Sequence, residues 1–383
     1  MDHLPRVVVI GYGNAGRSFH SYLVGLTPGL ELYGACARNP ETRARIREER
    51  DCKVYGSFDE VLADPNVDLV VLATPSHLHA EGAIQAMRAG KHVVTDKPAA
   101  CTTAEFDQMV AVSQETGRVL SVFHNRRWDG DYFTVRRIMQ EGRIGRVTRI
   151  EMNWAFCRMP AGWRGVAETA GGRVYDLGSH MIDQLCLLFP QAITSVYAKL
   201  QYESADHNVE SDAVIIVNFE DNATGIVQTG GISHIDKPRF YLAGLDGTFV
   251  KYGVDPQEVV MKVGDIDAAV ELPELYGQLK AADSPETETI PTIPGRWRSY
   301  YEAVAAEIAD GAAAAVPLDT VRRTMRVLDA AFESARTGQV VQMHESGDDA
   351  VKAAAELAVL ALPVDDIATM KTELAPSASG SMT

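Results

Sequence analysis

The sequence predicts an α/β protein of two domains, and three observations lead to this expectation. A glycine motif directly follows a run of β-branched residues near the N-terminus. Apolar strand-like runs then alternate with amphipathic helical stretches, a pattern typical of a parallel sheet. Later strands are longer and alternate in polarity, which indicates an antiparallel or mixed sheet with one open face. We therefore expect a doubly wound parallel sheet of the Rossmann type over residues 1–124, and a second α/β domain with a large, open, mostly antiparallel sheet over residues 125–343.

The glycine motif reads Gly11-x-Gly13-x-x-Gly16 and lies between the strand-like run Val7–Ile10 and a second strand at 30–35. The first glycine permits a tight strand-to-helix turn, the second lets the backbone approach a diphosphate, and the third allows close packing of helix on strand. A dinucleotide diphosphate can then bind the free N–H groups at the helix N-terminus. The motif predicts cofactor contacts from Gly11, Tyr12, Gly13, Asn14, Ala15 and Gly16.

The end of the second strand bears on the choice between NAD and NADP. Sites for NAD usually place an acidic residue here, about 20 residues after the first glycine, to bind the ribose hydroxyls. This chain has Cys36-Ala37-Arg38-Asn39 instead. Because no carboxylate repels a 2′-phosphate and a guanidinium can bind it through charge-assisted hydrogen bonds, NADP is favoured, with contacts from Ala37, Arg38 and Asn39. NAD stays open, since Arg38 can also be a solvated loop residue.

The composition is that of an ordinary soluble globular protein, with 46% hydrophobic and 23% charged residues among 383. Aspartate and glutamate number 52 against 36 lysines and arginines, so the formal net charge of −16 disfavours nucleic acid as a partner. No signal-peptide pattern opens the chain, and no apolar run approaches the ~20 residues of a membrane span. Five scattered cysteines without a C-x-x-C pair favour free thiols over disulfides or zinc. We expect a cytoplasmic protein without a membrane partner.

Residues typical of helix ends support the alternating pattern of strands and helices in the first domain. Ser57 with Glu60 resembles a capping box, and Gly90 and Gly117 end the helices expected at 80–89 and 104–116. The strands expected in this domain are Val7–Ile10, Leu32–Ala35, Leu69–Ala73, His92–Thr95 and Val119–Phe123.

In the second domain the turn pair Asp246-Gly247 predicts a hairpin between strands at 241–245 and 248–252. The segment 297–336 returns to helical periodicity and can pack on either domain. Residues 344–383 form an Ala-rich extension whose end we expect to be disordered. The open sheet suggests a homo-oligomer, a dimer or tetramer. Four further strands are expected at Val147–Phe156, Ala192–Tyr202, Ala213–Phe219 and Gly225–Gly231.

Two short motifs follow strands of the first sheet and therefore lie at its carboxyl edge, where open α/β folds bind ligands. They are Thr74-Pro75 and Asp96-Lys97-Pro98, and their first two residues are predicted to contact the cofactor. There Lys97 can stabilise an alkoxide that develops as hydride leaves an alcohol, although a surface lysine is the alternative. His79, in Ser76-His77-Leu78-His79, either contacts the cofactor or is structural.

The segment 171–185, GGRVYDLGSHMIDQL, carries the second set of candidate catalytic groups. If it is an α-helix entered after a Gly-Gly turn, Asp176, His180 and Asp183 lie on one face. Histidine is the natural proton acceptor near neutral pH, and an adjacent carboxylate can orient it. That carboxylate predicts a pKa of His180 above the ordinary value of about 6.5. A capped helix with a core histidine is the plainer alternative, and a metal site is disfavoured because no His-x-x-x-His or Cys pair accompanies the motif.

Together, the glycine motif, the lysine-proline pair and Asp-x-x-x-His after a Gly-Gly turn resemble the Gfo/Idh/MocA family of oxidoreductases, over about residues 5–343. The family's usual Glu-Lys-Pro is Asp96-Lys97-Pro98 here. By that resemblance Lys97, Asp176 and His180 match the catalytic lysine, aspartate and histidine. The block His124-Asn125-Arg126-Arg127-Trp128 is similar to the sugar- and cyclitol-oxidising branch that includes NADP-dependent scyllo-inositol dehydrogenases.

The resemblance implies a dehydrogenase that oxidises a secondary hydroxyl of a cyclitol or sugar, or reduces the ketone. In this hypothesis His180 removes the hydroxyl proton, Lys97 stabilises the oxyanion and Asp176 orients substrate and histidine. Two alternatives stay open: a redox-neutral lyase or glycosidase that retains its cofactor, and a non-catalytic NADPH sensor. The candidate substrate contacts, besides Asp176 and His180, are Asn125, Arg127, Trp163 and Arg164.

Overall fold

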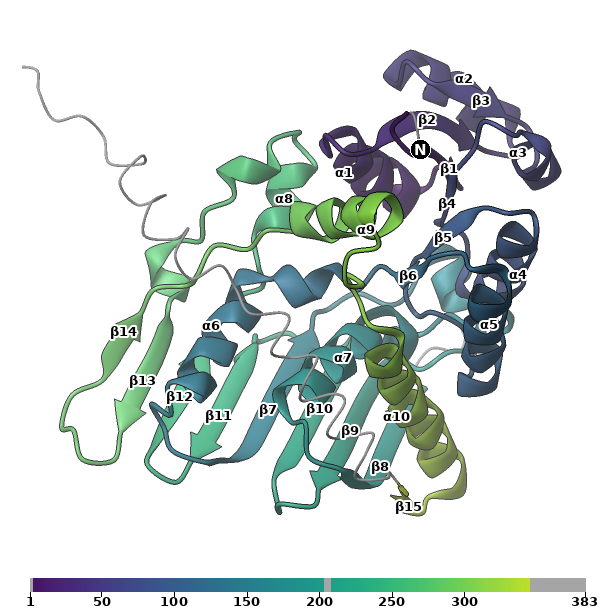
Figure 1. Ribbon diagram of the computed structural model, residues 1–383. Helices are drawn as coiled ribbons and strands as arrows, with labels where there is room; N and C mark the ends of the chain where they lie inside the picture. Colours follow the sequence, from purple (N-terminus) through teal and green to yellow (C-terminus); the bar gives the residue numbers. More distant parts are fainter. Residues whose placement is uncertain (1–2, 203–207, 345–383) are drawn as a thin grey trace, which may run out of the picture.

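The computed structural model describes residues 3–202 and 208–344, and these residues form two sheets with helices packed on them (Figure 1). The first sheet is entirely parallel and has the strand order of a Rossmann domain, which confirms the expected fold class. The order is β3 (Lys53–Tyr55), β2 (Glu31–Cys36), β1 (Arg6–Ile10), β4 (Leu69–Leu72), β5 (His92–Thr95) and β6 (Leu120–Val122).

The first sheet contains one strand that the sequence pattern misses. β3 has only three residues, which is too short to show a period of two, and its partner β2 holds it in place. The expected caps are present: the Ser57 hydroxyl accepts the Glu60 amide at 3.3 Å, and Gly117 ends its helix in the left-handed conformation. The helices of this domain are η1 (Ala15–His20), α1 (Ser21–Gly25), α2 (Pro40–Glu49), α3 (Phe58–Ala63), η2 (Ser76–Leu78), α4 (His79–Arg88) and α5 (Thr103–Thr116).

The second sheet has nine strands and is antiparallel except where β7 pairs with β10, as expected for a mostly antiparallel sheet. The predicted hairpin at Asp246-Gly247 joins β11 to β12. The strand order is β14 (Glu288–Ile290), β13 (Gly277–Ala281), β12 (Gly247–Lys251), β11 (Phe240–Gly244), β7 (Val147–Ala155), β10 (Thr224–Gly230), β9 (Asp212–Phe219), β8 (Ile193–Gln201) and β15 (Val341–Gln342).

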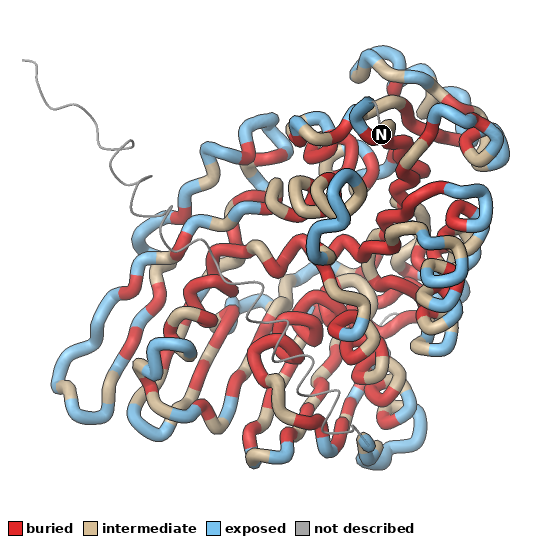
Figure 2. Tube along the Cα trace, in the orientation of Figure 1, coloured by how far each residue is buried: buried red, intermediate tan, exposed pale blue. Residues whose placement is uncertain are grey.

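Three helices, α6 (Gly130–Gln140), α7 (Ser179–Leu188) and α10 (Leu318–Thr337), lie along one face of the second sheet (Figure 1), and their contact with it forms the buried core seen in Figure 2. The opposite face is less covered. Residues that point toward it along β9 and β10 are half-buried, whereas the alternate residues, which face the helices, are buried. The remaining helices are η3 (Asn125–Trp128), η4 (Gly162–Gly165), η5 (Ala167–Thr169), η6 (Val174–Gly178), α8 (Gln257–Met261), η7 (Ile266–Ala268), η8 (Pro273–Leu275) and α9 (Arg298–Asp310).

The helical segment after residue 297 divides between the domains. α9 packs on the Rossmann domain, where the Tyr301 hydroxyl lies 2.7 Å from Nδ1 of His20. α10 packs on β8 and α7 of the second domain and also contacts α5 of the first, where Arg322 donates to Asp107. Across the described ranges, no helix combines the length and apolar character needed to cross a membrane. The disorder expected at the end of 344–383 concerns positions outside the described residues.

Candidate active site

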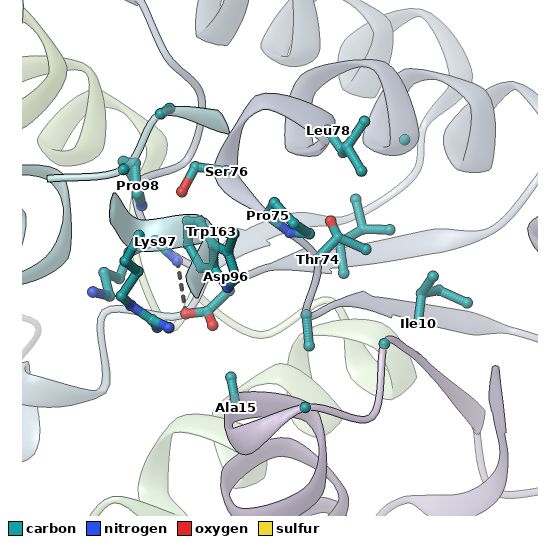
Figure 3. Close-up of a pocket in the computed structure, with 18 of the residues that line it drawn as sticks. Ile10, Ala15, Thr74, Pro75, Ser76, Leu78, Asp96, Lys97, Pro98 and Trp163 are labelled. Atoms are coloured by element: carbon teal, nitrogen blue, oxygen red, sulfur yellow. Dashed lines mark hydrogen bonds between the residues drawn. The ribbon is translucent and has the colours of Figure 1, made fainter. Parts of the chain in front are cut away.

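A cavity of about 530 Å³ lies at the carboxyl edge of the parallel sheet, between the glycine loop and the Gly-Gly turn of the second domain. Figure 3 shows Asp96, Lys97 and Trp163 gathered at one end, with Ile10 and Thr74 toward the other. The sequence-predicted residues that line it are Gly11, Gly13, Asn14, Ala15, Ala37, Arg38, Thr74, Pro75, Asp96, Lys97, Trp163, Arg164 and Asp176. The predicted residues outside this lining are Tyr12, Gly16, Asn39, His79, Asn125, Arg127 and His180.

The three motif glycines have different surroundings. Gly11 has φ +94°, and a Cβ there would lie 2.4 Å from the Ala73 carbonyl oxygen. At Gly16 a Cβ would lie 1.9 Å from the Gly11 carbonyl oxygen, so this glycine allows the helix to approach the strand. A Cβ on Gly13 would meet nothing within 4 Å, although Gly13 lines the cavity. At the start of η1, Asn14 provides no side-chain cap, so the first N–H groups of the helix stay available. The free space beside Gly13 and these N–H groups fit a dinucleotide diphosphate.

At the end of β2, Arg38 lines the cavity and is exposed. Asn39 instead caps α2, because its Oδ1 accepts the Glu41 amide at 2.8 Å. Arg43 is not among the predicted site residues, but it holds this loop by donating Nη1 to the carbonyl oxygens of Arg38 (2.7 Å) and Ala37 (3.1 Å). Its position one turn into α2 is the only sequence signal for this role. Two guanidinium groups, Arg38 on the loop and Arg43 from α2, therefore lie where an NAD site usually has an acid.

Lys97 contacts Asp176 across the cavity. Its Nζ donates to the Asp176 main-chain oxygen and lies 3.4 Å from Oδ1 of the same residue, while its own N–H donates to Asp96 Oδ1 at 2.8 Å. Burial lowers the pKa of Lys97, and the two carboxylates oppose that change. The Lys97 amine therefore lies at the cavity, where its ammonium form can stabilise an oxyanion.

Asp176 is surrounded by cations. Arg164 Nε donates to its Oδ1 at 3.0 Å, and Arg173 Nη1 lies 3.6 Å from its Oδ2. Burial disfavours the ionised carboxyl, but Lys97 and Arg164 outweigh it, so the pKa of Asp176 is lowered. Arg173 is not among the predicted site residues, and its one signal in the sequence is its place directly after the Gly-Gly turn.

His180 lies beside this group, and the expected rise in its pKa is wrong. Burial lowers the pKa of His180 well below the ordinary value, and Lys97 and Arg126 lower it further. The ring packs near Trp154, with centroids 6.2 Å apart, and its buried Nδ1 has no hydrogen-bond partner. The free imidazole is therefore neutral at physiological pH, which is the form a proton acceptor needs.

Asp183 lies three residues after His180 on α7 and is held in a buried ion pair with Arg127. Its carboxylate accepts two hydrogen bonds from Arg127, at 2.8 Å from Nε and 2.6 Å from Nη2. Arg127 also donates to Thr320, so this proposed substrate contact is held in a buried ion pair away from the cavity lining.

Two other predicted cofactor contacts serve to hold the loops. His79 is buried, with Nδ1 2.8 Å from the Pro98 carbonyl oxygen and Nε2 3.0 Å from that of Thr74, so it joins the two strand-edge motifs. The Tyr12 hydroxyl donates to Glu49 at 3.2 Å on α2. Within the part of the chain that the structure describes, no group of three or more His, Cys, Asp or Glu side chains is placed to hold a metal ion.

The fold and the cavity define the class of protein: an oxidoreductase with an NAD(P)-binding Rossmann domain. The chain belongs to the Gfo/Idh/MocA family. Residues 5–124 match the family model described as an oxidoreductase family with NAD-binding Rossmann fold, and residues 136–343 match its C-terminal alpha/beta domain.

Named relatives and solved structures agree with this assignment. The scyllo-inositol 2-dehydrogenase (NADP(+)) IolW of Bacillus subtilis is 33% identical over 348 residues, covering 88% of this chain and 96% of the relative. The 2,7-anhydro-N-acetylneuraminate hydratase of Mediterraneibacter gnavus is 27% identical over 257 residues, 62% of this chain and 66% of the relative. The structure of the oxidoreductase yvaA from Bacillus subtilis has a TM-score of 0.82 at 30% identity, covering 88% of this chain and 98% of that chain.

Proposed function

We propose that this protein is an NADP-dependent dehydrogenase that oxidises a secondary hydroxyl of a cyclitol or sugar, or reduces the corresponding ketone. The contact between Lys97 and Asp176 at the inner end of the dinucleotide cavity carries this proposal. The similarity to a scyllo-inositol 2-dehydrogenase supports the substrate class. An intact pair of this kind argues against a non-catalytic NADPH sensor, for which no chemistry at Lys97 is needed.

Each proposed role follows from the local environment of the residue. A bound nicotinamide supplies the hydride acceptor. The neutral His180 imidazole takes the hydroxyl proton, and the Lys97 ammonium stabilises the negative charge that develops on the substrate oxygen. Asp176 positions Lys97 rather than orienting the histidine, because its oxygens are the hydrogen-bond acceptors of Nζ. Trp163 and Arg164 line the same cavity and are the proposed substrate contacts.

The preference for NADP rests on Arg38 at the cavity and on the absence of an acid at the end of β2. A guanidinium binds a phosphate through two parallel charge-assisted hydrogen bonds, which a ribose hydroxyl does not offer. The NADP-dependent relative supports the same preference.

Steady-state assays with a panel of inositols, aldoses and their keto forms test this function. Absorbance of the reduced nicotinamide is followed with NAD and NADP in parallel. We expect turnover with at least one cyclitol or sugar and a higher kcat/KM with NADP. Turnover confined to acyclic alcohols, or a preference for NAD, would contradict the respective part of the proposal.

A redox-neutral reaction is the second candidate, and the hydratase relative favours it. In such a reaction the hydride is returned to the substrate within each turnover, so no reduced cofactor accumulates. Co-purification of dinucleotide, together with product formation and no net change in nicotinamide absorbance, identifies this case.

The half-covered face of the second sheet supports the further proposal that the protein is a homo-oligomer, since such faces are commonly buried between subunits. The cytoplasmic location stays a prediction from the sequence.

A further inference from the structure

Glu210, at the entry to β9, contacts the start of the helix that bears Asp176 and His180. It is 3% exposed, and its Oε1 accepts the Val174 amide at 2.7 Å. Val174 begins η6, which continues directly into α7. A carboxylate at this end of a helix satisfies an N–H group that has no partner within the helix and interacts favourably with the helix dipole.

The Gly-Gly turn is shaped around this carboxylate. Gly172 has φ +101°, and a Cβ there would lie 2.3 Å from Oε1 and 2.5 Å from Oε2 of Glu210. The second glycine therefore serves both the left-handed turn and the approach of the carboxylate to the helix.

Arg173 connects Glu210 electrostatically to the proposed catalytic pair. Its guanidinium lies 3.6 Å from Oδ2 of Asp176 and is attracted to the Glu210 carboxylate. Asp176 in turn accepts from Lys97. Charge therefore alternates along the series Glu210, Arg173, Asp176 and Lys97.

We propose that Glu210 is a positioning residue that holds Asp176 in place through the amide of Val174 and the guanidinium of Arg173, and so maintains the contact of Asp176 with Lys97. This proposal deepens the proposed function and rests on it for its catalytic meaning. Desolvation raises the pKa of Glu210 to about 6, as expected for a carboxylate enclosed between two elements. Besides Arg173, the titratable groups that sense its charge are Tyr175 and Tyr202.

In this proposal the negative charge of Glu210 keeps the pKa of Lys97 higher than it would otherwise be. Without this negative charge, the Arg173 charge acts on Asp176 with less compensation, and the positive potential around Lys97 rises. The pKa of Lys97 then falls, and a larger fraction of its amine is neutral and reactive at a given pH.

Glu210→Gln tests this, because it removes the charge while keeping the shape and one acceptor. The rate of reductive methylation of Lys97 across pH, read by peptide mass spectrometry, measures the fraction of neutral amine without needing a substrate. We expect methylation about three- to tenfold faster at pH 7, and faster hydrogen exchange in the peptide 171–188. In the assays above, we expect kcat to fall about tenfold with the KM for NADP unchanged.

Two variants separate positioning from a general charge effect. Glu168→Gln removes an equal charge from an exposed residue of the nearby η5, paired with Asn208, and should leave methylation, exchange and kcat at wild-type values. Glu210→Asp keeps the charge but withdraws the carboxylate from the Val174 amide by one methylene, so it should also speed methylation and exchange. Unchanged methylation and exchange in Glu210→Gln would overturn the proposal, as would equal acceleration in Glu168→Gln or wild-type rates in Glu210→Asp. If instead no polyol or sugar is turned over, the methylation and exchange results still decide the positioning role.

Discussion

The side chain of Lys97 is 11% exposed, and its ammonium group lies beside Asp176 at the cavity. Because it is proposed to stabilise the substrate oxyanion rather than the dinucleotide, Lys97→Ala should lower kcat by about 10²-fold or more. Binding of NADPH, followed by its fluorescence, should persist. The exposed Lys53, which pairs with Asp64, provides a control, since Lys53→Ala should keep wild-type kcat. Retained turnover in Lys97→Ala would remove this residue from the mechanism.

The lowered pKa of His180 determines where the rate of oxidation falls on the acid side. A base must be unprotonated, and burial together with the cations around His180 keeps the imidazole neutral to a lower pH than in water. We expect the acid limb of kcat/KM below about 6.5, the ordinary histidine value.

In His180→Asn that limb should disappear, together with about 10²–10⁴-fold of the rate. His3→Asn removes an exposed histidine near the N-terminus, outside the cavity lining, and should leave the profile unchanged. An unaltered limb at comparable activity in His180→Asn would place the base elsewhere, with Lys97 as the next candidate.

Arg38 is the residue proposed to distinguish the two dinucleotides. Arg38→Ala should weaken NADP binding about tenfold or more and leave NAD nearly unaffected, because only NADP carries the 2′-phosphate. Calorimetric titration of both dinucleotides measures this. Arg45→Gln removes a similar exposed charge from α2 and should change neither affinity by more than about twofold. Equal losses for NAD and NADP in Arg38→Ala would contradict the cofactor assignment.

At the scale of elements, two glycines of the glycine loop should affect different properties: Gly16 the stability of the fold and Gly13 the binding of the dinucleotide. Gly16→Ala places a Cβ against the Gly11 carbonyl oxygen, so helix and strand must move apart, and the free energy of unfolding should fall by about 1–3 kcal/mol. Gly13→Ala has open space for its Cβ and should keep the wild-type Tm. That Cβ faces the cavity, however, and should weaken dinucleotide binding. Denaturant titration and calorimetry test the pair, and an unstable Gly13→Ala would contradict this division.

The helix at 174–188, which bears Asp176 and His180, changes its geometry along its length. Its first five residues form a π-helical turn, whereas the sequence pattern predicts an α-helix throughout. One additional residue in a turn rotates the following positions by about 100° relative to an α-helix. Asp176 lies before this transition, whereas His180 and Asp183 lie after it on α7, where Asp183 pairs with Arg127.

For the whole molecule, the half-covered face of the second sheet leads to a prediction about assembly. Tyr197, Ile216 and Ile226 are cross-strand neighbours on this face and are each half-buried. If this face joins subunits, Ile216→Glu buries an unpaired charge in the interface and should shift the mass in light scattering toward the monomer. Leu245→Glu, at an exposed position of the β11–β12 hairpin, should not. A wild-type protein that is already monomeric would contradict the proposed oligomer.

Features that depend on neighbours in the chain were predictable from the sequence. The strand–glycine–helix order, the caps at Ser57 and Gly117, and the hairpin at Asp246 each need only a few consecutive residues with restricted backbone preferences. The carboxyl-edge location of Lys97 follows in the same way, because a parallel sheet puts the ends of its strands on one side. Local sequence therefore determined the fold class and part of the cavity lining.

The partners of buried charges were decided only by the tertiary structure. Arg127 pairs with Asp183, and Glu210 caps a helix that begins 36 positions earlier, so no local pattern connects them. The pKa of His180 is likewise lowered by desolvation and by cations from separate elements, whereas Asp176, four residues earlier in the sequence, suggested a rise. Desolvation and Coulomb energies depend on distance in space, and the chain brings these groups together only when both domains have folded.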